Sequence, residues 1–262
     1  MSQLQKIQFY DIAGNCTDDH AWSPNTWKTR YALNYKGLSY RTIWLEYPDI
    51  ERVCKEVGAK PSQEPKEGDS APPYYSCPFI YDPNTNTAVS DSARIARYLD
   101  KTYPETPAVI PPGTDALHAA FESAFASAVI MPLLPILLPA SHTYLNPRSQ
   151  DHYRRNRERE LGELFGGKLE DWSSPGPVRE EQWRAIREGL SKVNAWMTVD
   201  GHEKPYVMGN QVCYADLFVA AWLVWVKRIL GPQSSEWVEL ETWDGGRWGK
   251  LMKDMEQYEV VL

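Results

Sequence analysis

The chain has 262 residues, of which 42% are hydrophobic and 24% are charged, a composition typical of a soluble globular protein with one large or two small domains. Its formal net charge of −7 argues against a nucleic acid as the main partner. The five histidines are scattered, so we expect no metal site. Four cysteines lie far apart without a CxxC pair, which favours free thiols in a reducing, cytoplasmic setting: Cys16, Cys54, Cys77 and Cys213.

No segment has the pattern of a signal peptide or a membrane span. The N-terminal stretch MSQLQKIQFYDIAG lacks an apolar core and a small-residue cleavage pattern. The apolar stretch ADLFVAAWLVWV is shorter than the roughly 20 residues that a membrane span needs. The other, AVIMPLLPILLPA, is predicted to be broken by Pro132, Pro135 and Pro139. We therefore expect no membrane partner.

The first hundred residues alternate between strand and helix patterns. KIQFYDIAG predicts a short strand that ends at Gly14. AWSPNTWKTRYALNYKG then predicts a helix, with Ser23 as N-cap, Pro24 at the first helical position and Gly37 at the end. LSYRTIWLEY alternates as a second strand does.

A loop and a hairpin follow. The segment from Gly58 to Pro73 is rich in proline, glycine and charge, and is predicted to be a loop. SCPFIYDPNTNTAVSD predicts two strands joined by a turn, and DSARIARYLDKTYP predicts a helix. The order predicts a small mixed sheet covered by helices, an α/β domain over residues 1–103.

The remainder is predicted to be helical. A proline-rich linker over residues 104–113 precedes an all-α domain over residues 114–262. ADLFVAAWLVWVKRIL is apolar on all sides and is predicted to be its central buried helix. In DHYRRNRERE the arginines alternate with acids, and pairs such as Asp151 with Arg155 have helical spacing. We interpret this segment as a solvated helix face.

Three motifs in this order resemble those of the soluble glutathione transferases. They are SCPFI, SDSARIARYLD and GNQVCYADLFVAAWL. The resemblance implies a thioredoxin-like α/β domain followed by an all-helical domain, glutathione as co-substrate, and a homodimer. In the third motif Cys213 stands where the family has a capping Ser or Thr, and a thiol is a weaker acceptor.

The resemblance also implies roles in glutathione binding. Cys77 would present its backbone to the cysteinyl part of glutathione, with a cis bond to Pro78, whereas the alternative is a proline at a strand start. The family usually has an aliphatic residue in place of Cys77, which we interpret as a buried hydrophobic residue. Asp91 and Ser92 would bind the γ-glutamyl group; the alternative, which this motif taken alone favours, is that Ser90 or Asp91 only caps the helix.

Within the superfamily, AWSPNTWKTRYALNYKGLSY and the long insertion after Gly58 resemble the serine-type bacterial β-etherases and the related fungal-specific A class. This resemblance implies that Ser23 donates a hydrogen bond to the glutathione thiol, with Asn25 as assistant or substitute. Trp22, Met131 and Leu134 are candidate pocket residues, and packing in the helical core is the alternative.

The implied activity is conjugation of glutathione to small apolar or aromatic electrophiles, as in detoxification, with binding of such ligands as a further role. Two alternatives remain at this point. One is glutathione-dependent cleavage of β-aryl ethers, which uses the same activated thiolate. The other is a non-catalytic ligand carrier or regulatory protein of the same fold.

Overall fold

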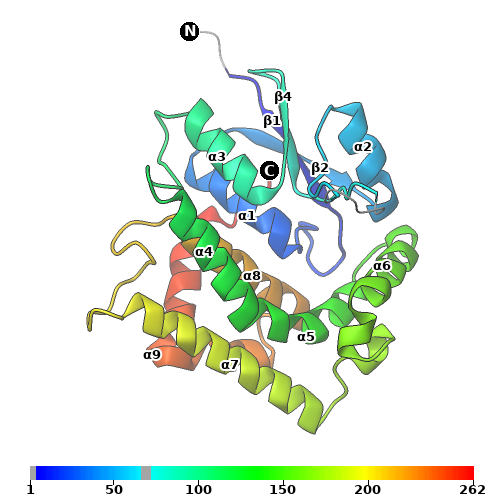
Figure 1. The fold of residues 1–262 in the computed structure, drawn as a ribbon, viewed down its shortest axis with the longest axis vertical. Coiled ribbons are helices and arrows are strands. Elements are labelled where there is room, and N and C mark those ends of the chain that lie inside the picture. The colour runs from blue at the N-terminus through cyan, green and yellow to red at the C-terminus, as the bar shows by residue number, and fades with distance from the viewer. Residues whose placement is uncertain (1–3, 66–71) are drawn as a thin grey trace.

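The computed structural model describes residues 4–65 and 72–262, and its N-terminal part is an α/β layer around a four-stranded sheet (Figure 1). The strand order is β2-β1-β3-β4, with β1 parallel to β2 and antiparallel to β3, and with β3 antiparallel to β4. The elements are β1 (Ile7–Ile12), α1 (Pro24–Tyr35), β2 (Tyr40–Leu45), η1 (Tyr47–Asp49), α2 (Ile50–Glu56), β3 (Phe79–Asp82), β4 (Thr87–Ser90) and α3 (Ser92–Thr102).

The strands and helices predicted in this part are confirmed, and one helix was missed. Helix α1 is the crossover that two parallel strands require, and it is buried because it lies between the sheet and α8. Helix α2 has no clear apolar period, since only Ile50 and Cys54 of its seven residues are buried. The predicted loop from Gly58 to Pro73 contains residues 66–71, which lie outside the described residues.

The second part is helical, as predicted. Helix α8 forms its centre, and every residue from Tyr214 to Val226 is buried. The elements are α4 (Asp115–Phe125), η2 (Ala126–Ile130), α5 (Met131–His142), α6 (Pro147–Phe165), η3 (Leu169–Asp171), α7 (Pro177–Met197), α8 (Tyr214–Leu230), α9 (Ser235–Met255) and η4 (Glu256–Tyr258).

The prediction that prolines break the apolar stretch is wrong. Residues 115–142 are helical throughout, with a π-helical turn over η2 directly before Pro132. Proline lacks the N–H that would bond the carbonyl of Ala128 in an α-helix. Gly189 of α7 packs so closely there that an added Cβ would lie 1.9 Å from the Ala128 oxygen. At this carbonyl α7 therefore approaches through a residue that has no side chain.

One continuous helical stretch among the described residues, Asp115–His142, meets the length and composition criteria of a membrane span. In the structure it packs against α7 and α8. A core helix of a soluble protein meets the same criteria, so the stretch is weak evidence for a membrane.

Helix α8 begins with the capping box that the third motif predicts, with Cys213 as N-cap and Asp216 as its partner. The backbone N–H and the thiol of Cys213 both donate to Oδ2 of Asp216, at 2.9 and 3.1 Å, and the N–H of Val207 donates to Oδ1 at 2.8 Å. The thiol therefore donates to Asp216 in addition to its part in the capping box, and the buried Asp216 carboxylate organises this helix start.

The C-terminal tail returns to the N-terminal domain. The Asn34 side chain donates to the carbonyls of Tyr258 and Val260, at 2.7 and 2.8 Å, and the Thr42 N–H donates to the carbonyl of Leu262 at 2.8 Å. These bonds join the segment after α9 to α1 and to the β2 edge of the sheet, so the two domains are connected at both ends of the helical part.

Candidate active site

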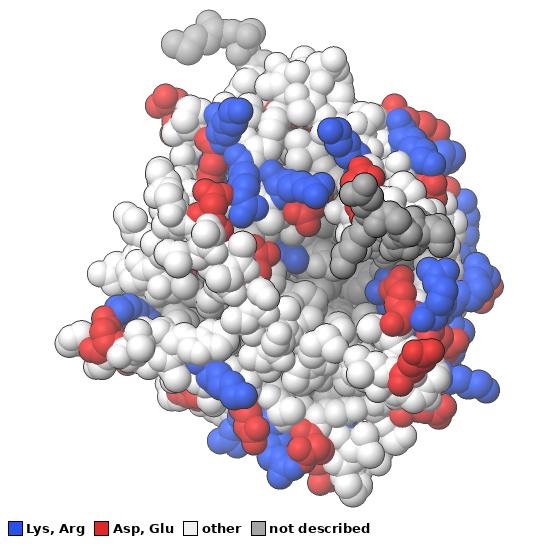
Figure 2. Space-filling view, viewed as in Figure 1, with Lys and Arg blue, Asp and Glu red and all other residues white. Residues whose placement is uncertain are grey.

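Two cavities meet at the N-terminus of α1, where the surface is hollowed between the two domains (Figure 2). Both are lined by Ser23, Asn25, Tyr47 and Arg157. The first, here called the polar cavity, has a volume of about 80 Å³ and is also lined by Tyr74, Tyr75, Ser76, Cys77, His152 and Asn156. The second, here called the apolar cavity, has a volume of about 130 Å³ and is also lined by Trp22, Leu134, Leu138, Leu161, Trp222 and Trp225.

Ser23 occupies the N-cap position of α1 without capping the helix through its side chain. Its carbonyl accepts the first helical bond, from the N–H of Trp27 at 3.0 Å, and a second from the Thr26 hydroxyl at 3.0 Å. Its hydroxyl makes no cap bond to α1. The hydroxyl is therefore available to a ligand at the positive end of the helix dipole. Asn25, in the first turn, is exposed and borders the same two cavities.

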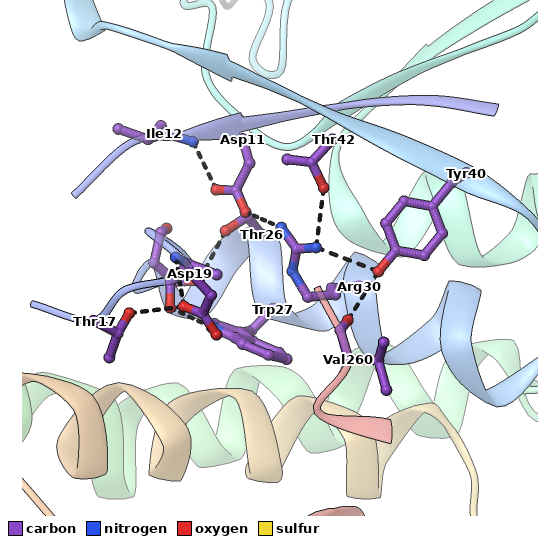
Figure 3. Close-up of polar contacts among 12 residues, drawn as sticks. Asp11, Ile12, Thr17, Asp19, Thr26, Trp27, Arg30, Tyr40, Thr42 and Val260 are labelled. Atoms are coloured by element: carbon purple, nitrogen blue, oxygen red, sulfur yellow. Dashed lines mark hydrogen bonds and ion pairs between the residues drawn. The ribbon is translucent and has the colours of Figure 1, made fainter. Parts of the chain in front are cut away.

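A fully buried ion pair supports α1 from behind (Figure 3). Arg30 of α1 donates to Asp11 of β1 at 2.7 Å, and to Thr42 and Tyr40 of β2 at 3.1 and 3.3 Å. The Tyr40 hydroxyl in turn donates to the carbonyl of Val260 at 3.0 Å. Burial raises the pKa of Asp11, and the guanidinium of Arg30 opposes that rise. The pair fixes the rotation of α1 relative to the sheet.

The loop before Ser23 is attached to the helical domain. Arg228 of α8 donates to Asp19 at 2.5 Å and to the carbonyl of Ala21 at 2.7 Å, and its guanidinium lies 4.5 Å from the centre of the Trp27 ring. A group two residues before Ser23 is thus held by a helix from the other domain.

Cys77, Pro78 and Asp91 lie together beside these cavities. The Cys77–Pro78 bond is cis, as the resemblance implied. The N–H of Asp91 donates to the carbonyl of Pro78 at 3.2 Å, which places the start of α3 next to Pro78. Burial raises the pKa of the Cys77 thiol well above its ordinary value, which supports its interpretation as a buried hydrophobic residue.

Asp91 caps α3, so the alternative interpretation of this residue as a helix cap is correct. Its Oδ1 accepts from the N–H groups of Ala93 and Arg94 at 3.1 and 3.0 Å. Its Oδ2 has no hydrogen-bond partner among residues 4–65 and 72–262. Ser92 is buried at the first position of the helix, and neither Asp91 nor Ser92 lines the two cavities.

Lys28, one turn into α1, is a charged residue that the sequence analysis did not identify. It is 7% exposed, and its ammonium lies 4.8 Å from the ring centre of Phe218 and 5.6 Å from that of Trp222. Burial lowers the pKa of Lys28 to about 8, while Glu122 and Asp91 act in the opposite direction. Nothing in the sequence pattern distinguishes it from the exposed lysines of other helices.

The interpretation of DHYRRNRERE as a solvated face is correct for only one side of α6. On that side Arg154 pairs with Glu158 and Glu170, at 3.1 and 2.6 Å; among the described ion pairs, the expected one between Asp151 and Arg155 does not occur. The other side lines the cavities. Helical spacing places its residues on one face, but that spacing does not show that the face borders a cavity: His152, Tyr153, Asn156, Arg157 and Leu161.

Two of the three predicted pocket residues line a cavity. Trp22 and Leu134 line the apolar cavity, with Trp22 packed so closely on Gly14 that an added Cβ there would lie 2.3 Å from the indole. Met131, one turn before Leu134, is 38% exposed and does not line either of the two cavities. Helical spacing alone did not show where the cavity ends.

Sequence comparison assigns both parts of the chain. Residues 22–102 match the glutathione S-transferase N-terminal domain, and residues 116–258 match the glutathione S-transferase C-terminal domain. The chain belongs to the glutathione S-transferase family. This family member is similar to the glutathione S-transferase-like protein ustS of Aspergillus flavus, with 30% identity over 85% of this chain and 80% of that protein.

Solved glutathione S-transferases share the whole fold. One from Ceriporiopsis subvermispora, CsGST63524, was crystallised in complex with glutathione and is 54% identical, with a TM-score of 0.93 over 98% of this chain and 99% of that one. GSTFuA3 from Phanerochaete chrysosporium is 41% identical, with a TM-score of 0.90 over 99% of this chain and 100% of that one. The predicted glutathione transferase fold is confirmed.

Proposed function

We propose that this family member is a serine-type glutathione transferase. In this proposal the Ser23 hydroxyl stabilises the glutathione thiolate, which attacks small aromatic or apolar electrophiles held in the apolar cavity. The observation that carries the proposal is the position of Ser23: its hydroxyl makes no cap bond, lies at a helix N-terminus, and borders both cavities. The 41% identity to GSTFuA3 supports the fungal-specific A class that the sequence resemblance implied.

The chemical requirement is a lower thiol pKa. A free thiol with a pKa of about 8.5 is only a few per cent ionised at pH 7. A hydrogen bond to a charged group such as the thiolate stabilises that group by about 1.5–3 kcal/mol. This energy corresponds to a fall of roughly one to two units in the thiol pKa. The N-terminus of α1 adds a smaller contribution in the same direction. Together these effects would make the thiolate the main form at neutral pH.

Glutathione would lie beside Cys77 and the start of α3. The backbone of Cys77 can pair with the cysteinyl backbone of glutathione, as an added strand would. The free Oδ2 of Asp91 suits the γ-glutamyl ammonium, and the N-terminus of α3 with the Ser92 hydroxyl suits the α-carboxylate. The complex of CsGST63524 with glutathione supports glutathione as the ligand of this family member.

The apolar cavity would hold the electrophile. Its walls combine indoles from α8 and the loop before α1 with leucines from α5 and α6, which suits a flat aromatic molecule. The cavity borders Ser23, so the acceptor and the thiolate would meet there. Glutathione-dependent cleavage of aryl ethers would use the same arrangement with a different leaving group.

The test is a titration of bound glutathione by the ultraviolet absorbance of the thiolate, in the wild type and in Ser23→Ala and Asn25→Ala variants. We expect a thiol pKa at least one unit below the free value in the wild type. In Ser23→Ala we expect a rise of about one to two units and a ten- to hundredfold slower conjugation of an aryl halide. Asn25→Ala should have a smaller effect.

Three results would change this conclusion. A bound thiol with its free pKa would favour a non-catalytic ligand carrier. An unchanged pKa in Ser23→Ala together with a raised one in Asn25→Ala would make Asn25 the donor. Faster turnover of a β-aryl ether than of any aryl halide, at equal thiol pKa, would make the protein an etherase.

A further inference from the structure

We propose that helix α6 of the second domain takes part in glutathione recognition, and that Arg157 binds the glycyl carboxylate of the tripeptide. This inference rests on the proposed function, because it concerns the same co-substrate. It concerns the end of glutathione opposite to the γ-glutamyl group, and it assigns that end to a helix that the sequence patterns indicated only as a solvated surface.

The position of the Arg157 side chain is the first argument. Its Nη2 donates to the hydroxyl of Tyr74 at 3.2 Å, and Tyr74 lines the polar cavity but not the apolar one. The guanidinium also lies 5.6 Å from the ring centre of Tyr153, a neighbour on the same helix. Through the bond to Tyr74 the charged end of Arg157 reaches the polar cavity, which Cys77 also lines, while Arg157 borders the apolar cavity as well.

The direction of a bound glutathione is the second argument. If the γ-glutamyl end lies at the start of α3, a tripeptide paired with the backbone of Cys77 must extend away from Asp91. The polar cavity includes Cys77, but none of its described lining residues belongs to α3. Its other lining residues include Tyr47 and Ile50, and the face of α6 that carries Arg157. The glycyl end would enter this space.

The charge of the polar cavity is the third argument. None of its described lining residues is acidic, and its lining includes the hydroxyl and amide groups of Tyr74, Ser76 and Asn156. His152 does not supply charge there, because burial and neighbouring arginines lower the pKa of its imidazole. Glu160 lies 2.9 Å from Nη1 of Arg157 and neutralises it only in part, since its side chain is 32% exposed.

An arginine in such a place suits a carboxylate. The planar guanidinium offers parallel N–H donors that match the two oxygens of a carboxylate, and a charge-assisted pair of this kind is stronger than one between neutral groups. Because α6 belongs to the helical domain and Cys77 to the α/β domain, glutathione held in this way would connect the two domains. The polar cavity would then bind the peptide end, and the apolar cavity would stay free for the acceptor.

The experiment compares glutathione with its glycyl monoethyl ester, which lacks the glycyl charge. Dissociation constants are measured by calorimetric titration for the wild type, Arg157→Gln and Arg157→Lys. Arg154→Gln serves as matched control, because Arg154 lies on the solvated side of the same helix. Circular dichroism and thermal unfolding verify that each variant is folded.

We expect the wild type to prefer glutathione over the ester by about 10- to 100-fold. Arg157→Gln should lose this preference by weakening only glutathione, and Arg157→Lys should retain part of it. Arg154→Gln should bind both ligands like the wild type. At saturating glutathione, the thiol pKa in Arg157→Gln should remain at its wild-type value, so this result is separate from any failure of the Ser23 proposal.

Other outcomes would overturn the inference. Equal weakening of glutathione and ester in Arg157→Gln would mean that Arg157 only maintains the shape of the cavity. An absence of preference in the wild type would mean that the glycyl carboxylate is not recognised at all. If Arg157→Gln binds glutathione normally and loses affinity for a carboxylated aromatic acceptor, Arg157 belongs to the acceptor site instead.

Discussion

Replacing Lys28 by methionine is expected to stabilise the ligand-free protein at neutral pH. The Lys28 ammonium is buried between α1 and α8, over the rings of Phe218 and Trp222, and burial lowers its pKa from the ordinary 10.5 to about 8. Since one pKa unit corresponds to about 1.4 kcal/mol, keeping Lys28 charged in the folded state costs about 3 kcal/mol. Methionine fills the space without a charge.

The direction in which the free energy of unfolding changes with pH follows from proton binding at Lys28. Between about pH 8 and 10.5 the unfolded chain binds a proton at Lys28 that the folded protein has released, so the free energy of unfolding rises with pH in this window. Below about pH 8 both states are protonated and this stabilisation is lost. The advantage of Lys28→Met over the wild type should therefore shrink by about 3 kcal/mol between pH 7 and pH 10.5.

The assay is urea unfolding, followed by tryptophan fluorescence at several pH values, for the wild type, Lys28→Met and Lys28→Arg. Arginine keeps its charge over the whole range, so Lys28→Arg should not gain the stabilisation that the wild type acquires above about pH 8. A constant difference between wild type and Lys28→Met across this range would refute the reasoning, because it would show that Lys28 is equally charged in both states.

Three further perturbations test the packing around the site. Gly189→Ala should lower the free energy of unfolding by about 1–3 kcal/mol, since the new Cβ would meet the Ala128 oxygen at 1.9 Å; wild-type stability in urea would mean that α7 and η2 are not in this contact. Asp11→Asn should cost about 3–5 kcal/mol, because it leaves the buried charge of Arg30 unpaired, and a much smaller loss in thermal unfolding would contradict a dry ion pair. Asn34→Ala removes two bonds to the C-terminal tail and should cost about 1–3 kcal/mol, with faster amide exchange in the tail as the direct readout.

Much of the fold could be predicted because its signals are local. The strand of β1, the crossover helix α1 and the buried helix α8 each depend on the pattern of residues within one segment. Helix α2 was not predicted, because only two of its residues, Ile50 and Cys54, are buried and they give no clear hydrophobic period. The continuity of the helical stretch over residues 115–142 could not be predicted either, because proline is a helix breaker in local patterns, whereas the structure has a π-helical turn before Pro132 and a close contact with Gly189 there.

The same distinction applies to the site. The motifs around Ser23, Pro78 and Asp91 could be recognised, and their order along the chain pointed to a glutathione site. The remaining charged groups could not be found in this way. Lys28 and Arg157 look like ordinary surface residues of helices until the packing of α1 on α8, and of α6 beside the polar cavity, decides what surrounds them.

The sequence by itself determined the order of the elements, the division into an α/β part and a helical part, and the position of Ser23 at a helix start, since capping and hydrophobic periodicity act over a few residues. Only the tertiary structure decided that the Ser23 hydroxyl makes no cap bond and borders two cavities. It also decided that one face of α6 lines both. Burial and the direction of a side chain depend on elements that are distant in sequence, so local patterns cannot supply them.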